Sequence, residues 1–143
     1  MSDNTYPKEA PFVVVPIQVR LSDTDMFRHI NNVSYLAFTE SVRMEYFLKF
    51  GVNLRKEMCI NRSISVDYQK AATLLDPLVG LARITRMGNT SIEMEVQIAN
   101  ALDHSLVYAI FHIVQINVCA KTGKPTPVSE ELRASLKDAG QIS

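Results

Sequence analysis

The chain has 143 residues, of which 47% are hydrophobic, and its fifteen basic and fifteen acidic residues cancel to a formal net charge of zero. This length favours a single domain spanning residues 1–143, and the hydrophobic share is ample for its core. Because no block of one charge sign stands out, the basic surface that binds nucleic acid is missing, and we expect no nucleic-acid partner.

The chain ends and the apolar runs argue against export and membrane insertion. Residues 1–11 lack the basic start and the apolar core of a signal peptide, so we expect a flexible tail there, and a second tail over residues 133–143. The longest apolar runs are β-like and contain charged or amide residues, which predicts no membrane span. Cys59 and Cys119 have no metal-ligand partners at short spacing and are interpreted as reduced thiols of a cytoplasmic protein.

The first predicted element is a strand over residues 12–21, FVVVPIQVRL. It is rich in β-branched residues, and apolar and polar residues alternate after Pro16, as in a half-buried strand. Because Pro16 has no N–H to donate to a neighbouring strand, this strand should lie at a sheet edge or carry a bulge.

A long helix is predicted next, over residues 33–50, a stretch without glycine or proline. Asn31 or Asn32 is its expected N-cap, and Gly51 stands just beyond its end, where a glycine commonly terminates a helix. Apolar side chains surround most of its circumference, so other structure should cover it on most sides.

Four strand-like runs follow the helix, separated by turn signals such as Asp76-Pro77 and Met87-Gly88-Asn89. They cover residues 59–69, 78–86, 91–99 and 106–119. Long strands joined by short turns predict an antiparallel meander. One apolar helix and such a sheet must share a core, so we predict an α+β domain whose sheet curves around the helix.

The polar segment of residues 22–32, SDTDMFRHINN, lies between the first strand and the helix. Two carboxylates, a histidine and two amides are more polar chemistry than a simple connection needs, so we predict the active site here. A metal site built on Asp23, Asp25 and His29 is the alternative, but no second cluster of His, Asp or Cys completes a coordination shell, and we predict none. Asp23 is instead expected to hydrogen-bond the turn.

The motif D-x-D-x-x-x-H-x-N-N-x-x-Y-L, which begins at Asp23, and the continuation AFTESVRMEYFLKFG resemble the hotdog-fold acyl-CoA thioesterases of the 4-hydroxybenzoyl-CoA thioesterase type. The resemblance extends from about Val13 to about Leu132. It implies a hotdog fold, in which an antiparallel sheet of about five strands wraps one long central helix. It also implies hydrolysis of an acyl-CoA to the free acid and CoA, with CoA as part of the substrate and no separate cofactor.

The resemblance implies specific roles for the polar residues. The second acid of the motif, Asp25, would act as nucleophile on the thioester carbonyl or as general base for water. The backbone N–H of Asn32, at the start of the helix, suits the developing oxyanion. His29 either contributes to catalysis or only hydrogen-bonds the loop. Glu40 is a secondary candidate for the chemistry, and the simpler alternative is that it pairs with Arg43.

Binding of the CoA phosphates calls for basic groups or backbone N–H groups. Similar enzymes place basic or small polar residues just before a serine that starts a strand, which here corresponds to Asn89, Thr90 and Ser91. Asn89 and Thr90 carry no charge, so the mode of nucleotide binding stays open. Arg62 and Lys124 are further candidates near strand ends. The residues that either line an acyl pocket or pack in the core are Met26, Phe27, Met44, Phe47 and Met58.

Exposed, β-prone sheet edges favour pairing with a second copy of the chain. The resemblance likewise implies a homodimer, with a tetramer as an option, and an active site at the subunit interface. Asp25 would then act against residues of the other chain, from the strands that include Tyr68 and Ser91. Two other functions stay open: a thioesterase for acyl groups on a carrier protein, and a non-catalytic acyl-CoA sensor.

Overall fold

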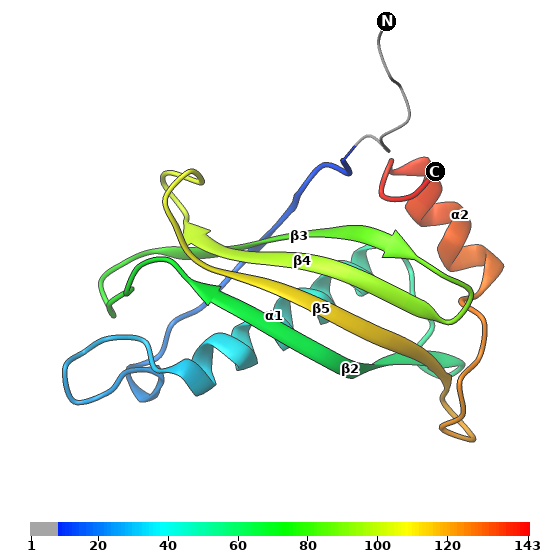
Figure 1. The fold of residues 1–143 in the computed structure, drawn as a ribbon, viewed down its shortest axis with the longest axis horizontal. Helices are drawn as coiled ribbons and strands as arrows, with labels where there is room; N and C mark the ends of the chain where they lie inside the picture. Colours follow the sequence, from blue (N-terminus) through cyan, green and yellow to red (C-terminus); the bar gives the residue numbers. More distant parts are fainter. Residues whose placement is uncertain (1–8) are drawn as a thin grey trace, which may run out of the picture.

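The computed structural model describes residues 9–143. It contains one antiparallel five-stranded sheet with a long helix, α1, against one face, which confirms the predicted α+β class and hotdog architecture (Figure 1). The elements are β1 (Val13–Pro16), the short 3-10 helix η1 (Leu21–Asp23), α1 (Asn32–Lys49), β2 (Glu57–Tyr68), β3 (Leu78–Met87), β4 (Ser91–Asn100), β5 (Val107–Cys119) and α2 (Glu130–Asp138). Most of the tail expected over residues 1–11 lies outside the described residues, but Ala10 within it is buried.

The strand order in the sheet is β1-β3-β4-β5-β2, so the predicted four-strand meander is only partly right. β3, β4 and β5 form a meander, whereas β2 pairs with β5 at the far edge and not with β3. The reason lies in the connection from β2 to β3. The Ile30 N–H donates to the Ala72 carbonyl at 2.9 Å, and His29 forms a β-bridge with Thr73. The connection therefore follows the loop before α1 and does not form a hairpin.

β1 is much shorter than the strand predicted over residues 12–21. It pairs with β3 alone, from Val13 opposite Ala82 to Pro16 opposite Val79, so Pro16 does lie on an edge strand. Beyond Pro16 the chain leaves the sheet, and the alternation that predicted a longer strand instead belongs to a segment that packs beside α1.

α1 begins and ends at the residues that its capping signals indicate. The Asn31 side chain accepts a hydrogen bond from the Ser34 N–H at 2.8 Å, and Gly51 has the positive φ of 83° that glycine adopts without strain. Val42 and Tyr46 are fully buried against the sheet. Gly80 of β3 lies directly against Val42, so the helix and the sheet approach closely at this point.

Residues 130–138 form α2, which corrects the tail expected over residues 133–143. Ser129 caps the helix, and Leu132 and Leu136, one turn apart, are buried at 2% and 0% exposure. These leucines form the short apolar stripe of a surface helix. α2 covers the end of the sheet opposite to the loop before α1 (Figure 1). Neither α1 nor α2 has both the length and the hydropathy needed to span a membrane.

One half of the sheet's inner face is open. α1 packs chiefly against β1, β3 and β4, and β2 lies beyond it at the sheet edge. Large apolar side chains of β2 on this inner face therefore stay between 36% and 44% exposed, namely Ile64, Val66 and Tyr68. A contiguous apolar strip of this kind marks an interaction surface more often than an ordinary outer surface.

Candidate active site

The Asp25 side chain is held by the loop in which it lies. Its Oδ1 accepts hydrogen bonds from the Phe27 N–H at 2.8 Å and the His29 N–H at 3.1 Å. The Asp25 N–H donates to the His29 carbonyl at 2.8 Å, which closes the loop. Arg28 completes the turn with a positive φ of 64°, unusual for a residue with a side chain. Oδ2 has no hydrogen-bond partner among residues 9–143, and the residue is exposed. The loop thus fixes one carboxylate oxygen and leaves the other available.

Asp23 fastens this loop to the helix. Its Oδ2 accepts from the Arg20 N–H at 2.8 Å, its Oδ1 accepts from the Ser34 hydroxyl at 3.0 Å, and its carbonyl accepts from the Asn31 N–H at 2.9 Å. The expectation that Asp23 hydrogen-bonds the turn is confirmed. Both oxygens of Asp23 are occupied, so Asp23 positions the loop, whereas Asp25 keeps one oxygen without a partner in the described part of the chain.

The first turn of α1 supplies unpaired donors. Neither the Asn32 N–H nor the Val33 N–H donates a hydrogen bond to any residue that the structure describes, because Asn31 caps the Ser34 N–H instead. Free N–H groups at a helix start, together with the positive end of the helix dipole, favour a negatively charged oxygen. The Asn32 side chain itself is exposed.

The other two catalytic candidates take different positions. His29 contacts Asp25 through its backbone, and its exposed imidazole makes no hydrogen bond within residues 9–143. Glu40 is exposed, one turn before Arg43 on α1, and forms no ion pair with it. Glu40 lines a cavity, whereas the His29 side chain has neither a hydrogen-bond nor an ion-pair partner among the described residues.

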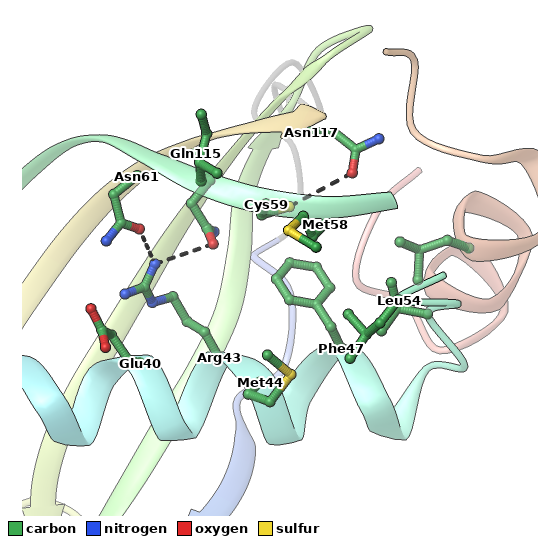
Figure 2. Close-up of a pocket in the computed structure, with 13 residues that line it drawn as sticks. Glu40, Arg43, Met44, Phe47, Leu54, Met58, Cys59, Asn61, Gln115 and Asn117 are labelled. Carbon is green, nitrogen blue, oxygen red and sulfur yellow. Dashed lines mark hydrogen bonds between the residues drawn. The ribbon is translucent and has the colours of Figure 1, made fainter. Parts of the chain in front are cut away.

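A cavity of about 430 Å³ opens between the second half of α1 and the start of β2 (Figure 2). Met44 and Phe47 of α1 face Met58 of β2 across it, so three of the five residues proposed for an acyl pocket do line a cavity. The other two, Met26 and Phe27, lie on the Asp25 loop with exposures of 88% and 72%. The volume falls in the range of about 300–1,000 Å³ that small-ligand sites occupy.

One side of this cavity is polar, which the sequence did not reveal. Figure 2 shows the Arg43 guanidinium directed from α1 toward the amides of Asn61 and Gln115, and both amides accept hydrogen bonds from it. Asn117 lies further along β5, where it accepts a weak hydrogen bond from the Cys59 thiol. Burial raises the pKa of that thiol to about 12. The available signal was the pair of amides, Gln115 and Asn117, at alternate positions of a strand that is otherwise mostly apolar.

Comparison with known proteins identifies the family. A family model described as the thioesterase-like superfamily matches residues 19–136. The chain belongs to this superfamily. The uncharacterized protein YsmA of Bacillus subtilis (strain 168) is 25% identical over 122 residues, which cover 84% of this chain and 82% of YsmA.

Solved structures share the fold of this thioesterase-like protein. The PA5185 protein of Pseudomonas aeruginosa strain PAO1 superposes with a TM-score of 0.83 at 24% identity, covering 93% of this chain and 94% of that one. A thioesterase of Thermus thermophilus, crystallised with coenzyme A and Zn, has a TM-score of 0.77 at 22% identity, with coverages of 95% and 98%. Family membership supports thioester hydrolysis as the class of reaction. Within residues 9–143, no group of three or more His, Cys, Asp or Glu side chains is arranged to hold a metal ion.

The nucleotide-binding candidates of this thioesterase-like chain lie near the cavity and far from Asp25. The Asn89 and Thr90 carbonyls accept hydrogen bonds from the N–H groups of Val128 and Asn117, and the Lys124 carbonyl accepts from Cys119. Ser91 starts β4 opposite Ile116 of β5, and Arg62 is exposed at the β2 bulge. Asn89, Thr90, Ser91 and Lys124 gather at the α2 end of the sheet, whereas Arg62 lies in the middle of β2, so its predicted place near a strand end is wrong. Asp25 lies just before the first turn of α1, at the other end of this helix, whose 18 residues span about 27 Å.

Proposed function

We propose that this protein hydrolyses acyl-CoA thioesters, with the free oxygen of Asp25 as the reactive group. The observation that carries the proposal is the difference between the two oxygens of this carboxylate. Oδ1 accepts two backbone hydrogen bonds, and Oδ2 accepts none from residues 9–143. A fixed carboxylate with one free oxygen is suited to attack a carbonyl carbon or to take a proton from water. The crystallisation of the Thermus thioesterase with coenzyme A supports CoA as the carrier.

The Asp25 carboxylate and the unpaired N–H groups at the start of α1 together allow two routes of hydrolysis. As nucleophile, Oδ2 bonds to the thioester carbon and the C–S bond breaks; the CoA thiolate leaves and takes a proton from water, and a second water hydrolyses the acyl anhydride. As general base, Asp25 takes a proton from water, whose oxygen attacks the same carbon; the C–S bond then breaks, and the proton passes from Asp25 to the CoA thiolate. Both routes place negative charge on the carbonyl oxygen, which the unpaired Asn32 and Val33 N–H groups would stabilise.

A second copy of the chain would bring the separated parts of the site together. β2 is an edge strand, and its inner side chains are partly exposed. Its Tyr68 end lies at the start of α1, where the Tyr35 and Tyr68 rings are 5.6 Å apart. Its other end, at Met58, lines the cavity. Two β2 edges paired antiparallel about their midpoint would set Tyr68 of one chain close to Met58 of the other.

This pairing would move the Asp25 loop of one chain to the cavity of the other. In such a homodimer the start of the partner's α1, with its Asp25 loop, would come beside the cavity and the Asn89–Ser91 turn of the first chain. The exposed Met26 and Phe27 of that loop would meet the apolar mouth of the cavity. The acyl group would occupy the cavity of one chain while Asp25 of the other acts on its thioester. Pairing of two such dimers into a tetramer is compatible with this arrangement.

The substitution Asp25→Asn tests the chemistry separately from the fold. Asn keeps an Oδ1 that accepts from Phe27 and His29, and it replaces only the free oxygen. With an acyl-CoA panel and colorimetric detection of released thiol, we expect kcat to fall by about 10³-fold or more, within the range for loss of a positioned acid–base group. The melting temperature should change by less than about 2 °C, as for exposed substitutions.

The matched control is Asp103→Asn. Asp103 is another exposed aspartate whose Oδ1 accepts from a backbone N–H two residues on, at 3.0 Å. This variant should keep full activity. Activity retained in Asp25→Asn would refute the assignment. Faster turnover of the same acyl group on a carrier protein than on CoA would favour the carrier-protein thioesterase, and tight acyl-CoA binding without turnover would favour the sensor.

A further inference from the structure

Arg43 is a buried cation on the polar side of the candidate acyl cavity. Its residue exposure is 6%, and burial lowers its pKa, although an arginine remains charged under physiological conditions. The ion pairs of residues 9–143 involve Arg83 and Arg86, so no carboxylate lies within ion-pair distance of Arg43. A buried charge is tolerated only where hydrogen bonds replace its hydration.

The groups that replace this hydration are all neutral. Nε donates to the Thr39 carbonyl at 3.1 Å, and Nη1 donates to Gln115 Oε1 at 3.2 Å and to Asn61 Oδ1. Nη2 has no hydrogen-bond partner in the described part of the chain. One terminal nitrogen of the guanidinium is therefore free to donate.

The orientation of the two amides follows from the chemistry of arginine. A guanidinium has donors and no acceptor, so Asn61 and Gln115 must turn their oxygens toward it and their NH₂ groups away. Gln115 Nε2 is buried and has no partner among the described residues. Each amide thus presents donors to its surroundings, and the acceptors on the polar side of the cavity are the Glu40 carboxylate and Asn117 Oδ1.

The rest of the cavity lining is largely apolar and includes Met44, Phe47 and Met58. A purely hydrocarbon acyl chain would fit this apolar lining but, once it had displaced water from the cavity, would leave the Arg43 donor without an acceptor, which is unfavourable. The lining also includes Glu40, whose negative charge balances that of Arg43 and would repel a carboxylate. A neutral oxygen, as in a hydroxyl or keto group, satisfies the donor without this repulsion.

We infer that the cavity selects acyl groups that carry a hydroxyl or keto oxygen beyond the thioester, with Arg43 as the residue that binds this oxygen and Gln115 as the residue that orients Arg43. This inference rests on the proposed function, because it takes the cavity to hold the acyl part of the substrate.

The test compares octanoyl-CoA with its ω-hydroxy, (ω−1)-oxo and ω-carboxy counterparts, which share one chain length. For the wild-type protein we expect kcat/KM to be about tenfold higher for the hydroxy and oxo substrates than for octanoyl-CoA, as for one satisfied hydrogen bond in a buried site. Equal kcat/KM values for octanoyl-CoA and its hydroxy and oxo counterparts would overturn the inference. The highest kcat/KM for the ω-carboxy substrate would also overturn it.

The variant Gln115→Glu keeps the side-chain shape and gives Arg43 a carboxylate partner, so the cation is neutralised inside a folded protein. We expect the ratio of the hydroxy to the plain substrate to fall toward one. The control Gln18→Glu makes the same substitution at an exposed position before η1, outside this cavity, and should keep the wild-type ratio. If melting shows that Gln115→Glu is unfolded, Arg43→Lys retains the charge without the planar fork and should also lower the ratio. A wild-type ratio in a folded variant would count against the roles of Arg43 and Gln115.

Failure of the proposed function is distinguishable from failure of this inference. If no acyl-CoA is hydrolysed, binding of non-hydrolysable thioether analogues of the same acyl pairs can be measured by calorimetry. A Kd about tenfold lower for the hydroxy analogue than for the octyl analogue would support the selection without any catalysis. Equal Kd values would exclude it.

Discussion

Substitution of Gly80 by alanine tests how closely α1 must approach the sheet. A Cβ built at Gly80 would lie 2.8 Å from Val42 Cγ1 and closer still to Val42 Cγ2. Val42 is fully buried, so its methyl groups have no free space to move into. Such overpacking costs about 1–3 kcal/mol, and the lower chain entropy of alanine in the unfolded state offsets about 0.4–1 kcal/mol of it. We therefore expect the Gly80→Ala variant to lose about 1–2 kcal/mol of unfolding free energy.

The melting temperature should report this loss. An unfolding entropy of about 2.1 cal/mol/K per residue gives about 0.3 kcal/mol/K for this chain, so the variant should melt about 3–7 °C lower in a thermal scan. The double variant Gly80→Ala, Val42→Ala identifies the cause, because removing the Val42 methyl groups removes the collision. Its loss should be smaller than the sum of the two single losses by about 1 kcal/mol or more. Additive losses, or an unchanged melting temperature in Gly80→Ala, would refute the close approach of helix and sheet.

Two further predictions concern the start of α1 and the cysteines. Asn31→Ala should lower the unfolding free energy by about 1 kcal/mol in urea titration and should also lower kcat, because the freed first turn carries the proposed oxyanion donors. Ser129→Ala removes the cap of α2 at similar stability loss but should leave kcat unchanged, and an equal fall in kcat in both variants would contradict this role. In iodoacetamide labelling near pH 8, followed by peptide mass spectrometry, Cys119 should react much faster than Cys59. Hydrogen bonds from Thr122 lower the pKa of the Cys119 thiol, whereas burial raises that of Cys59, and comparable labelling rates would be inconsistent with these environments.

The sequence predicted those elements whose signals are local. The limits of α1 follow from an asparagine that caps its first turn and a glycine with positive φ beyond its last, and the edge position of β1 follows from Pro16. Strand pairing is not a local property. β2 pairs with β5, which is distant in the sequence, and the connection from β2 to β3 is held by a hydrogen bond between Ala72 and Ile30, which are also far apart in the sequence. α2 was missed because its apolar stripe consists mainly of two leucines in a strongly polar stretch.

The Asp25 loop and the cavity also differ in whether local sequence signals predict them. The Asp25 loop was predicted because its groups are contiguous and match a family motif. The polar side of the cavity combines Arg43 from α1, Asn61 from β2 and Gln115 from β5, and no spacing pattern connects these three positions. Arg43 was interpreted as a partner for Glu40 because the two are one turn apart. The actual partners are amides of β2 and β5, and no sequence periodicity predicts that these strands meet α1 at Arg43.

The exposed strip on β2 bears on how firmly two copies would associate. Its three apolar side chains, Ile64, Val66 and Tyr68, are between 36% and 44% exposed, so burying the remainder would yield roughly 1 kcal/mol each, or about 6 kcal/mol for both chains of a dimer. Association costs of about 4–15 kcal/mol in lost rigid-body freedom are of the same size. Apolar burial on this strip is therefore insufficient for a tight dimer, and pairing of the two β2 backbones would have to supply the rest. Because the same pairing would carry Asp25 of one chain to the cavity of the other, catalysis and assembly would depend on the same row of main-chain hydrogen bonds.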